Sequence, residues 1–408
     1  MISVWLLLLV TKIWEQRKLK NLITEPLSYG LSVSSKEYDG IHKYLRITDI
    51  DEKSRKFNKD KLTSPDIKFN SSSKKYLLSN NDIVFARTGA STGKTYMYQK
   101  EDGIVYYAGF LIKASLSSNF DNNFIFQQTY RKRYYQRVKV ISQRSGQPGI
   151  NSKEYGNFDF LITQIEEQNK IGKLFKIFDN LLALYERKLK LLSQVKKYFL
   201  DNLFTEKEYP NLRFKGFTDA WEQRKLGDIS EKRIEKNNSL SIDNILSNSA
   251  IYGIVKQNQY FDKTIANNIQ NYYIVHTNDF IYNPRISNNA PFGPISRNKL
   301  AESGVMSPLY LVFYFSKKSL SDFFEIYFKS SKWHNFMYMH GNSGARSDRF
   351  AIKDNEFFKM RVKIPHNKSE IDKIYRLNIL LNSLITLYES KKQNLNKIKN
   401  TLLNTMFI

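Results

Sequence analysis

Residues 14–19 read Trp-Glu-Gln-Arg-Lys-Leu, and residues 221–226 repeat the same six amino acids. An identical hexapeptide at this separation predicts an internal duplication. Each copy opens a segment of roughly 150 residues that closes with a long amphipathic stretch, so the repeated unit is a domain plus a helix and not a short solenoid repeat. The sequence therefore predicts two similar domains and an approximate two-fold symmetry within one chain.

The two long stretches carry further evidence, because residues 167–204 align without gaps on residues 370–407. Apolar residues recur in both at alternating spacings of three and four, which is the heptad pattern of a helix that packs against another helix. A helix packed on its own domain would need a wider apolar stripe. The predicted helix-pairing residues are Ile171, Leu174, Leu181, Tyr185, Leu192, Ile374, Leu377, Leu384, Tyr388 and Leu395.

Antiparallel pairing of these helices as a coiled coil would place one domain at each end of a rod of roughly 60 Å, given 1.5 Å of rise per residue. Between the helices, strand-like runs such as residues 83–87 and 309–315 alternate with turns rich in Gly, Asn and Pro. The predicted fold class is mixed α/β, with two similar domains built on mixed sheets. The expected segments are an atypical N-terminal lead-in (1–13), a first domain (14–163), a first long helix (164–205), a linker (206–220), a second domain (221–366) and a second long helix (367–408).

Two short features recur inside the domains. Each contains Asn-Asp before a strand, at residues 81–82 and 278–279, and each has a late glycine-containing turn, at residues 145–149 and 341–344. Most other side chains differ. Two domains of one fold with divergent surfaces suit a protein that reads two different half-targets.

The composition indicates what such domains bind. A formal charge of +25, from 64 Lys and Arg against 39 Asp and Glu, predicts a polyanionic partner, and nucleic acid is the commonest one. An AT-rich genome would enrich Lys, but codon bias alone does not create this imbalance. The chain has no cysteine, which excludes disulfides, Cys-ligated zinc and a thiol nucleophile, and its five histidines show no metal-ligand spacing.

The apolar run at residues 4–10 is too short to span a bilayer. It also has no basic region before it and no small-residue cleavage site after it, so it does not read as a secretory signal. The expectation is a cytoplasmic protein without a membrane partner.

Three motifs resemble catalytic ones but are incomplete. Residues 89–95 resemble a phosphate-binding loop, yet Thr88 stands where the motif requires glycine, and the next residues look like a strand and not a helix. Asn283-Pro284-Arg285 lacks the second proline and the aromatic residue with which methyltransferases hold a flipped base. Asp66 is not followed by the carboxylate and lysine of a metal-dependent nuclease. We expect no catalysis from this chain.

Four features together resemble a known family. They are the lead-in at residues 212–229, the segments 81–83 and 87–94, the run Ser307-Pro308-Leu309-Tyr310 followed by Phe313, and the paired helices. In these features, over residues 14–407, the chain resembles the specificity subunits of type I restriction-modification systems.

The resemblance implies two target recognition domains, each of which grips one half of a split, asymmetric sequence in double-stranded DNA, with the helices fixing the gap. It also implies that catalysis belongs to partners. Two methyltransferase (modification) subunits would bring S-adenosylmethionine and methylate adenine, and restriction/translocase subunits would use ATP and Mg²⁺ to translocate and cut. No cofactor is expected on this chain itself.

Polar loop residues are the expected DNA contacts, because Arg, Asn and Gln can make bidentate hydrogen bonds to base edges. Any one of them can instead contact phosphate, as most protein–DNA hydrogen bonds do. The candidates are Arg87, Thr88, Ser91, Lys94, Gln143, Arg144, Ser145, Gln147 and Asn151 in the first domain, and Asn283, Arg285, Asn288, Asn289, Asn342, Ser343, Arg346 and Arg349 in the second.

Two other functions stay open from the residues alone. A stand-alone, two-headed DNA-binding regulator would bind its site selectively without a partner. A self-contained modification enzyme with degenerate motifs would bind S-adenosylmethionine or nucleotide in isolation.

Overall fold

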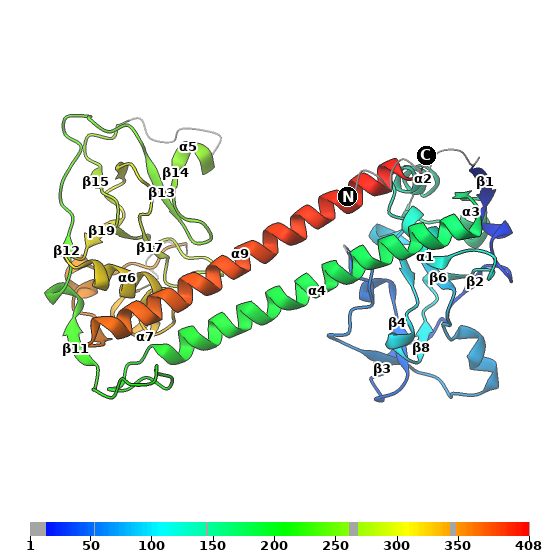
Figure 1. Ribbon diagram of the computed structural model, residues 1–408, viewed down its shortest axis with the longest axis horizontal. Coiled ribbons are helices and arrows are strands. Elements are labelled where there is room, and N and C mark those ends of the chain that lie inside the picture. Colours follow the sequence, from blue (N-terminus) through cyan, green and yellow to red (C-terminus); the bar gives the residue numbers. More distant parts are fainter. Residues whose placement is uncertain (1–13, 53, 144–145, 261–267, 343–347, 408) are drawn as a thin grey trace. The chain divides into compact units, whose positions relative to one another are not determined.

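The computed structural model of the chain describes residues 14–52, 54–143, 146–260, 268–342 and 348–407. The predicted N-terminal lead-in, 1–13, lies outside these residues. The chain divides into two compact units (Figure 1). The first unit consists of Met1–Arg187 with Ser390–Ile408, and the second consists of Lys188–Glu389. The unit boundaries differ from the predicted domain boundaries because each unit includes a part of both long helices.

The first unit is built around a four-stranded antiparallel sheet with the strand order β2-β9-β6-β7. These strands are β2 (Ser28–Tyr29), β9 (Leu111–Ser115), β6 (Asp82–Ala86) and β7 (Thr95–Met97). Three strand pairs surround it: β1 (Glu15–Lys18) with β10 (Asp159–Ile162), β3 (Ser35–Glu37) with β5 (Thr63–Pro65), and β4 (Lys43–Leu45) with β8 (Val105–Tyr107), the last one parallel.

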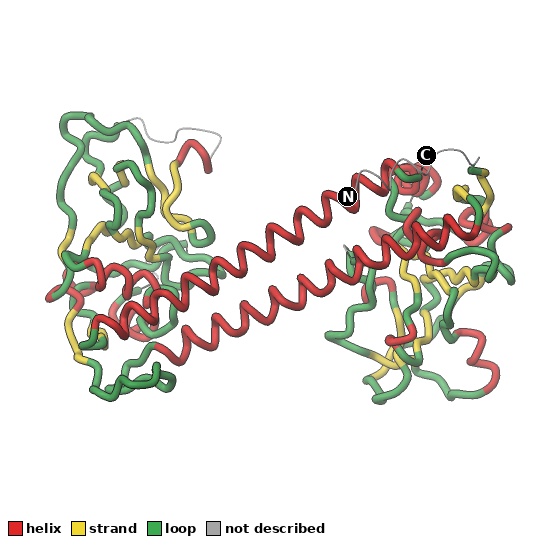
Figure 2. The backbone as a smooth tube through the Cα atoms, in the orientation of Figure 1, coloured by secondary structure: helices red, strands yellow, loops and turns green. Residues whose placement is uncertain are grey.

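The helices of the first unit are short, apart from the parts of the two long helices that it includes. They are α1 (Asn122–Gln128), α2 (Lys132–Ile141) and α3 (Ser152–Gly156), followed by α4 (Ile165–Leu203). Short 3-10 helices occur at η2 (Leu19–Asn21), η3 (Ile47–Asp49), η4 (Ser71–Tyr76), η5 (Gly89–Ser91) and η6 (Lys100–Asp102). Loops and turns connect the short strands in both units (Figure 2).

The central sheet of the second unit has the equivalent strand order, β12-β19-β16-β17, although the third outer strand pair of this unit is antiparallel and not parallel. These strands are β12 (Glu231–Lys232), β19 (Leu311–Tyr314), β16 (Phe280–Tyr282) and β17 (Ile295–Arg297). Its strand pairs are β11 (Glu222–Lys225) with β20 (Arg361–Ile364), β13 (Leu246–Ser249) with β14 (Gly253–Lys256), and β15 (Tyr273–Val275) with β18 (Gly304–Met306). Its helices are η7 (Leu226–Asp228), α5 (Gln257–Tyr260), α6 (Lys318–Tyr327), α7 (His334–His340), α8 (Asp354–Phe357) and α9 (Lys368–Thr405).

The repeated hexapeptide has the same structural role in both units. Its first copy forms β1, which pairs with the strand immediately before α4, and its second copy forms β11, which pairs with the strand immediately before α9. Glu15 lies opposite Ile162, and Glu222 lies opposite Ile364. The predicted duplication is therefore confirmed at the level of topology, and the fold class is mixed α/β as expected.

The repeated Asn-Asp pair is a turn that starts the central strand. Asn81 and Asn278 adopt positive φ angles of 78° and 77°, in the left-handed region that Asn tolerates better than most residues. The carboxylate of Asp82 accepts a hydrogen bond from the backbone N–H of Ser79 at 2.7 Å, and Asp279 accepts one from His276 at 2.8 Å. The Asn-Asp pair therefore forms the same turn in both units.

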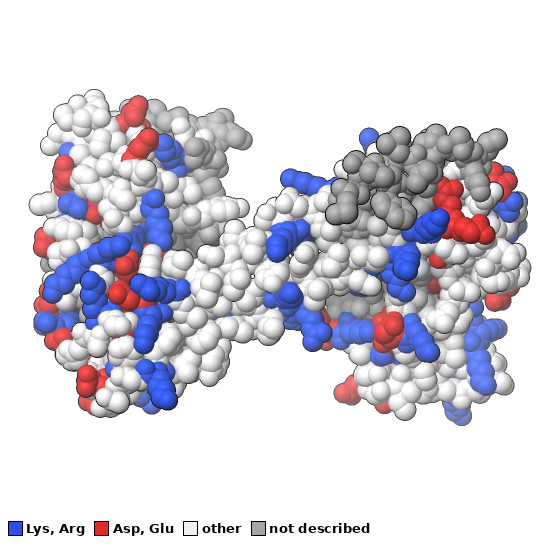
Figure 3. Space-filling model, viewed as in Figure 1, with Lys and Arg blue, Asp and Glu red and all other residues white. Residues whose placement is uncertain are grey.

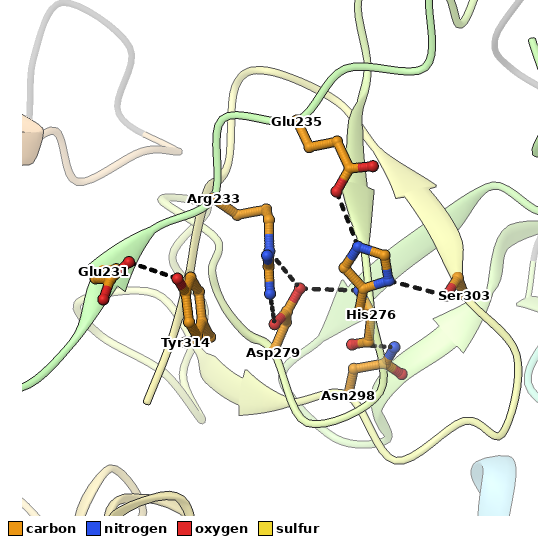
Figure 4. Close-up of polar contacts among 8 residues, drawn as sticks. All are labelled: Glu231, Arg233, Glu235, His276, Asp279, Asn298, Ser303 and Tyr314. Carbon is orange, nitrogen blue, oxygen red and sulfur yellow. Dashed lines mark hydrogen bonds and ion pairs between the residues drawn. The ribbon is translucent and has the colours of Figure 1, made fainter. Parts of the chain in front are cut away.

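In the second unit this aspartate also anchors a side-chain network (Figure 4). Asp279 forms a bidentate ion pair with Arg233, at 3.2 and 2.9 Å, and the Arg233 guanidinium lies 4.1 Å from the ring centroid of Tyr314. Tyr314 donates to Glu231 at 2.5 Å. Because Glu231 belongs to β12 and Tyr314 to β19, the network ties an edge strand to its neighbour.

The end of each long helix contributes a phenylalanine to an aromatic core. Phe407, just beyond α9, lies in the core of the first unit, with ring centroids 5.8 Å from Trp14 and 5.2 Å from Phe124. Phe204, just beyond α4, lies in the core of the second unit, 5.3 Å from Phe323. Both phenylalanines are 1% exposed, so each helix end is fixed by apolar burial.

The long helices α4 and α9 run antiparallel where they meet inside each unit. In the first unit, Lys399 pairs with Asp179 at 2.6 Å and Lys392 pairs with Glu186 at 2.8 Å. In the second unit, the Lys188 ammonium lies 5.1 Å from the ring centroid of Tyr388. The predicted antiparallel direction therefore agrees with these contacts.

The predicted pairing residues of the two helices are buried to very different degrees. Ile171 and Ile374 are buried, whereas Leu181 is 37% exposed. Leu174, Tyr185, Leu192, Leu377, Leu384, Tyr388 and Leu395 are half-buried. A continuous coiled-coil seam therefore stays a prediction. Across the described residues, none of the helices contains a stretch long and apolar enough to cross a membrane.

Candidate nucleic-acid interface

Two loops that the sequence analysis singled out meet in the first unit. The loop after β6 and the loop after α2 are joined by a β-bridge between Thr88 and Gly149. Gly89 donates its N–H to the Pro148 carbonyl at 2.9 Å, and Ile150 donates to the Arg87 carbonyl at 2.9 Å. Residues that are far apart in the chain, such as Thr88 and Gln147, therefore lie on one edge of the first unit.

Arg87 is held in place at this edge. Its guanidinium lies 4.8 Å from the ring centroid of Tyr29, and the Tyr29 hydroxyl accepts a hydrogen bond from the Ser152 backbone N–H at 3.1 Å. A cation–π contact of this kind orients the guanidinium while leaving its edge available for hydrogen bonds. The sequence analysis missed Tyr29, because its contact with Arg87 depends on how the chain folds.

The equivalent loops of the second unit meet in the same way. The loop after β16 and the loop after α7 are joined by a bridge between Arg285 and Arg349, and Phe350 donates its N–H to the Pro284 carbonyl at 2.7 Å. The structure thus places two predicted arginines side by side. The Arg285 side chain is 65% exposed and lies 3.7 Å from the Asp348 carboxylate.

These loops border a cleft of about 690 Å³ in the second unit. Asn248, in its wall, is 2% exposed and is fixed by hydrogen bonds from its Nδ2 to the carbonyls of Ile281 and Pro294, at 2.8 and 3.1 Å. Burial raises the pKa of Tyr310, against the opposing charges of Arg285 and Arg349. Its hydroxyl therefore stays protonated at neutral pH. The lining also includes Ser249, Ala250, Ile251, Gln257, Asn288, Asn289 and Leu309.

Two of the predicted DNA contacts, Asn283 and Lys94, have side chains that bond within the protein. Asn283 is 8% exposed, and its amide bonds inward to the Asn248 carbonyl and the Arg285 N–H, both at 2.9 Å. The Lys94 side chain is 12% exposed, and its ammonium pairs with Glu52 at 2.6 Å. Both side chains already have partners within the protein, and their contacts with DNA stay predictions.

The other candidates occupy varied positions. Asn151 is exposed, but its side-chain oxygen accepts the Glu154 N–H at 2.9 Å and so caps α3. Asn342 is exposed and bridges to the Ala351 backbone. Gln143, Gln147, Asn288 and Asn289 are exposed, whereas Arg87, Thr88, Ser91 and Arg349 are half-buried. Arg144, Ser145, Ser343 and Arg346 lie outside the described residues.

The glycine-containing segment 89–95 does not form a nucleotide-binding loop. Gly89–Ser91 is a single 3-10 turn, and the chain continues as strand β7 from Thr95, so no helix N-terminus faces a phosphate there. The predicted strand after this loop is confirmed. Within the described ranges, no group of three or more His, Cys, Asp or Glu residues is arranged to hold a metal ion.

Positive charge is widespread on both units. Figure 3 shows Lys and Arg side chains over the visible face of each unit, with fewer Asp and Glu between them. This distribution agrees with the excess of 64 Lys and Arg over 39 Asp and Glu in the chain. A surface of this kind attracts a polyanion such as the DNA backbone.

The family model of the type I restriction modification DNA specificity domain matches residues 12–194. The MjaVIII type I restriction enzyme specificity subunit of Methanocaldococcus jannaschii is 24% identical over 199 residues, which cover 47% of this chain and 43% of that protein. The putative MjaX specificity subunit of the same organism is 23% identical over 424 residues, which cover 96% of this chain and 92% of that protein.

Among solved structures, the S subunit of a type I restriction-modification system from M. genitalium is similar, with a TM-score of 0.62 and 14% identity. The match covers 98% of this chain and 97% of that one, and it shows a shared fold. The resemblance predicted from the sequence is therefore confirmed: the chain is similar to the DNA specificity subunits of type I restriction-modification systems.

Proposed function

We propose that this chain is the non-catalytic, DNA-reading subunit of a type I restriction-modification complex. The observation that carries the proposal is the pair of equivalent edges, one in each unit, where two loops meet and present arginine and amide side chains. Such side chains suit both phosphate contacts and base edges. The formal charge of +25 and the relationship to specificity subunits support the same assignment.

Each unit would read one half of a split target. The two edges have the same backbone connections but different side chains at equivalent positions. Arg87 and Thr88 in the first unit correspond to Pro284 and Arg285 in the second, since Asp82 and Asp279 start the equivalent strands. Different side chains at one backbone position would read different bases, so the two half-targets would differ and the whole target would be asymmetric.

The catalytic steps would belong to partners. We expect two methyltransferase subunits that carry S-adenosylmethionine, and restriction/translocase subunits that use ATP and Mg²⁺. The helices α4 and α9, with 39 and 38 residues, would set the gap between the half-targets, because an α-helix has a fixed rise of 1.5 Å per residue. The complex would act in the cytoplasm, where it meets chromosomal DNA.

The test compares this chain alone, a cognate type I methyltransferase subunit alone, and the purified complex of the two. Each sample receives unmethylated genomic DNA and radiolabelled S-adenosylmethionine. We expect methyl transfer to DNA only with the complex. Transfer by the chain alone would instead identify a self-contained enzyme.

A second measurement separates a specificity subunit from a stand-alone regulator. DNA duplexes that bind each sample are recovered from a random-sequence pool at about 0.15 M salt, where non-specific phosphate contacts are weakened. The complex should enrich a split motif, and the chain alone should enrich none. Strong enrichment by the chain alone, without complex formation, would favour the regulator and contradict the proposal.

A further inference from the structure

An exposed apolar side chain recurs at the same position of both units. Phe110 precedes β9 and is 59% exposed, and Leu309 precedes β19 and is 63% exposed. The two positions correspond through the strand register. Ile112 pairs with Phe85, three residues after Asp82, and Leu311 pairs with Tyr282, three residues after Asp279. Phe110 lies two residues before Ile112, and Leu309 lies two residues before Leu311, so the two side chains occupy equivalent positions.

In the first unit, Phe110 lies beside the predicted DNA-reading arginine. Its carbonyl accepts the Arg87 N–H at 3.0 Å, so the two residues share a backbone hydrogen bond. The preceding Gly109 packs closely: a Cβ built there would lie 2.5 Å from the Ser32 hydroxyl oxygen and 3.2 Å from the Leu31 carbonyl oxygen. The Phe110 side chain, which is 59% exposed, therefore extends from a closely packed turn that is bonded to the Arg87 loop.

In the second unit, Leu309 lines the same cleft as Arg285 and Arg349. Tyr310, the residue after Leu309, lines this cleft as well. Ile251, at the tip of the β13–β14 hairpin, also lines the cleft and is 67% exposed. The second edge therefore combines cationic and apolar side chains, as the first one does.

Single exposed apolar residues are common on protein surfaces. Their recurrence at one backbone position, in two units that differ in most side chains, needs a reason. Each lies beside arginine at an edge assigned to DNA, where an apolar protein partner would have to bury those charges. In the major groove, by contrast, the thymine C5-methyl group is an apolar feature next to hydrogen-bonding edges.

We propose that Phe110 and Leu309 are specificity-determining residues, each of which contacts a thymine methyl group in the half-target of its own unit. The inference rests on the proposed function and adds the base that this position selects. Arginine would supply hydrogen bonds to neighbouring bases, and the apolar side chain would favour thymine over cytosine, which has no methyl group.

The first experiment maps methylated adenines in a methylation-free host that expresses the methyltransferase with the wild-type chain, Phe110→Ala or Leu309→Ala. We expect Phe110→Ala to relax one thymine position in one half of the motif, and Leu309→Ala to relax one in the other half. Matched controls are Ile41→Ala and Ile234→Ala, which remove side chains that are 58% and 73% exposed elsewhere in the two units. The control motifs should equal the wild-type motif.

The second experiment replaces each thymine of the mapped target by deoxyuridine and measures the affinity of the purified complex. One replacement in each half should weaken wild-type binding by about fourfold, as expected for loss of one buried methyl group. The replacement in the half read by the first unit should have no effect on the Phe110→Ala complex. The replacement in the other half should likewise have no effect on the Leu309→Ala complex.

Three results would overturn the inference. Unchanged motifs in both variants, beside a split wild-type motif, would refute it and leave the proposed function intact. Increased 2-aminopurine fluorescence next to the contact, lost in the alanine variant, would show a wedge that unstacks bases from the minor groove and not a methyl contact. Absence of any wild-type motif, despite a stable complex, would refute the proposed function together with the inference.

Discussion

A buried ion pair fixes the segment before Trp221 to the start of α9 and gives the sharpest stability prediction. Arg213 donates from Nε and Nη2 to the Glu370 carboxylate at 2.7 and 2.9 Å, and Trp221 Nε1 lies 3.4 Å from the same carboxylate. The Arg213 and Glu370 side chains are 15% and 1% exposed. In Glu370→Ala the guanidinium would remain in this site without its partner.

Breaking a buried pair by removing one partner costs about 3–5 kcal/mol. We expect about 3 kcal/mol for Glu370→Ala, at the lower end of that range, because the partly exposed Arg213 can recover some hydration. The matched control is Glu167→Ala, at the corresponding position of α4. Glu167 accepts a hydrogen bond from the Thr163 hydroxyl, and losing a bond of this kind costs about 1 kcal/mol.

The assay is hydrogen exchange with mass spectrometry on the full chain in its complex, because two units do not unfold as one two-state system. A loss of about 3 kcal/mol in the free energy of opening speeds exchange by about a hundredfold. The effect should appear in peptides of the second unit and not in those of the first. The double variant Arg213→Met, Glu370→Met should recover most of the protection. If Glu370→Ala and Glu167→Ala accelerated hydrogen exchange to the same extent, this reasoning would be refuted.

Three further predictions concern the cores and the reading edges. Phe407→Ala should destabilise the first unit by about 3–5 kcal/mol, measured by hydrogen exchange in peptides of that unit, because it empties a site against Trp14 and Phe124; unchanged exchange would contradict the aromatic core. Gly293→Ala should abolish reading of the second half-target only, measured by methylation mapping, because Gly293 has a φ of +82° and a Cβ there would lie 2.0 Å from a backbone oxygen; an unchanged motif would contradict it. Arg87→Ala should weaken specific binding by about tenfold or more, measured by fluorescence anisotropy, whereas Lys94→Ala should not, because Lys94 is paired within the protein; equal losses would contradict the assignment.

The duplication, the long helices and the mixed fold could be predicted because they depend on local pattern. The hexapeptide at residues 14–19 and its second copy form equivalent strands, and the heptad stretches form α4 and α9. The Asn-Asp pairs at residues 81–82 and 278–279 could be recognised for a similar reason. Their positive φ angle and the turn hydrogen bond are local requirements that both copies keep.

The candidate site could be predicted only in outline. The sequence singled out the loops, but it did not show that they meet in pairs, and burial of each side chain depends on long-range packing. The Asn283 side chain donates to the Asn248 carbonyl, 35 positions away in the sequence, and Lys94 forms an ion pair with Glu52 on another loop. The same reason explains why Tyr29 was missed: the pattern around it carries no sign of Arg87.

The heptad pattern did not predict two details of the helices. Charged contacts such as Asp179–Lys399 accompany the apolar positions, and Leu181 remains 37% exposed despite its place in the seam. Spacing alone gives the face of a helix that is apolar. It does not give the depth at which that face is covered along a helix of 39 residues.

The most direct measurement is the genome-wide map of methylated adenines in a methylation-free host that expresses this chain with a cognate type I methyltransferase. A host that expresses the methyltransferase without this chain serves as the control. Our account predicts one asymmetric motif with two specific halves and a fixed unspecified gap, present only when the chain is present. A motif that is continuous, or identical in the control, would contradict it.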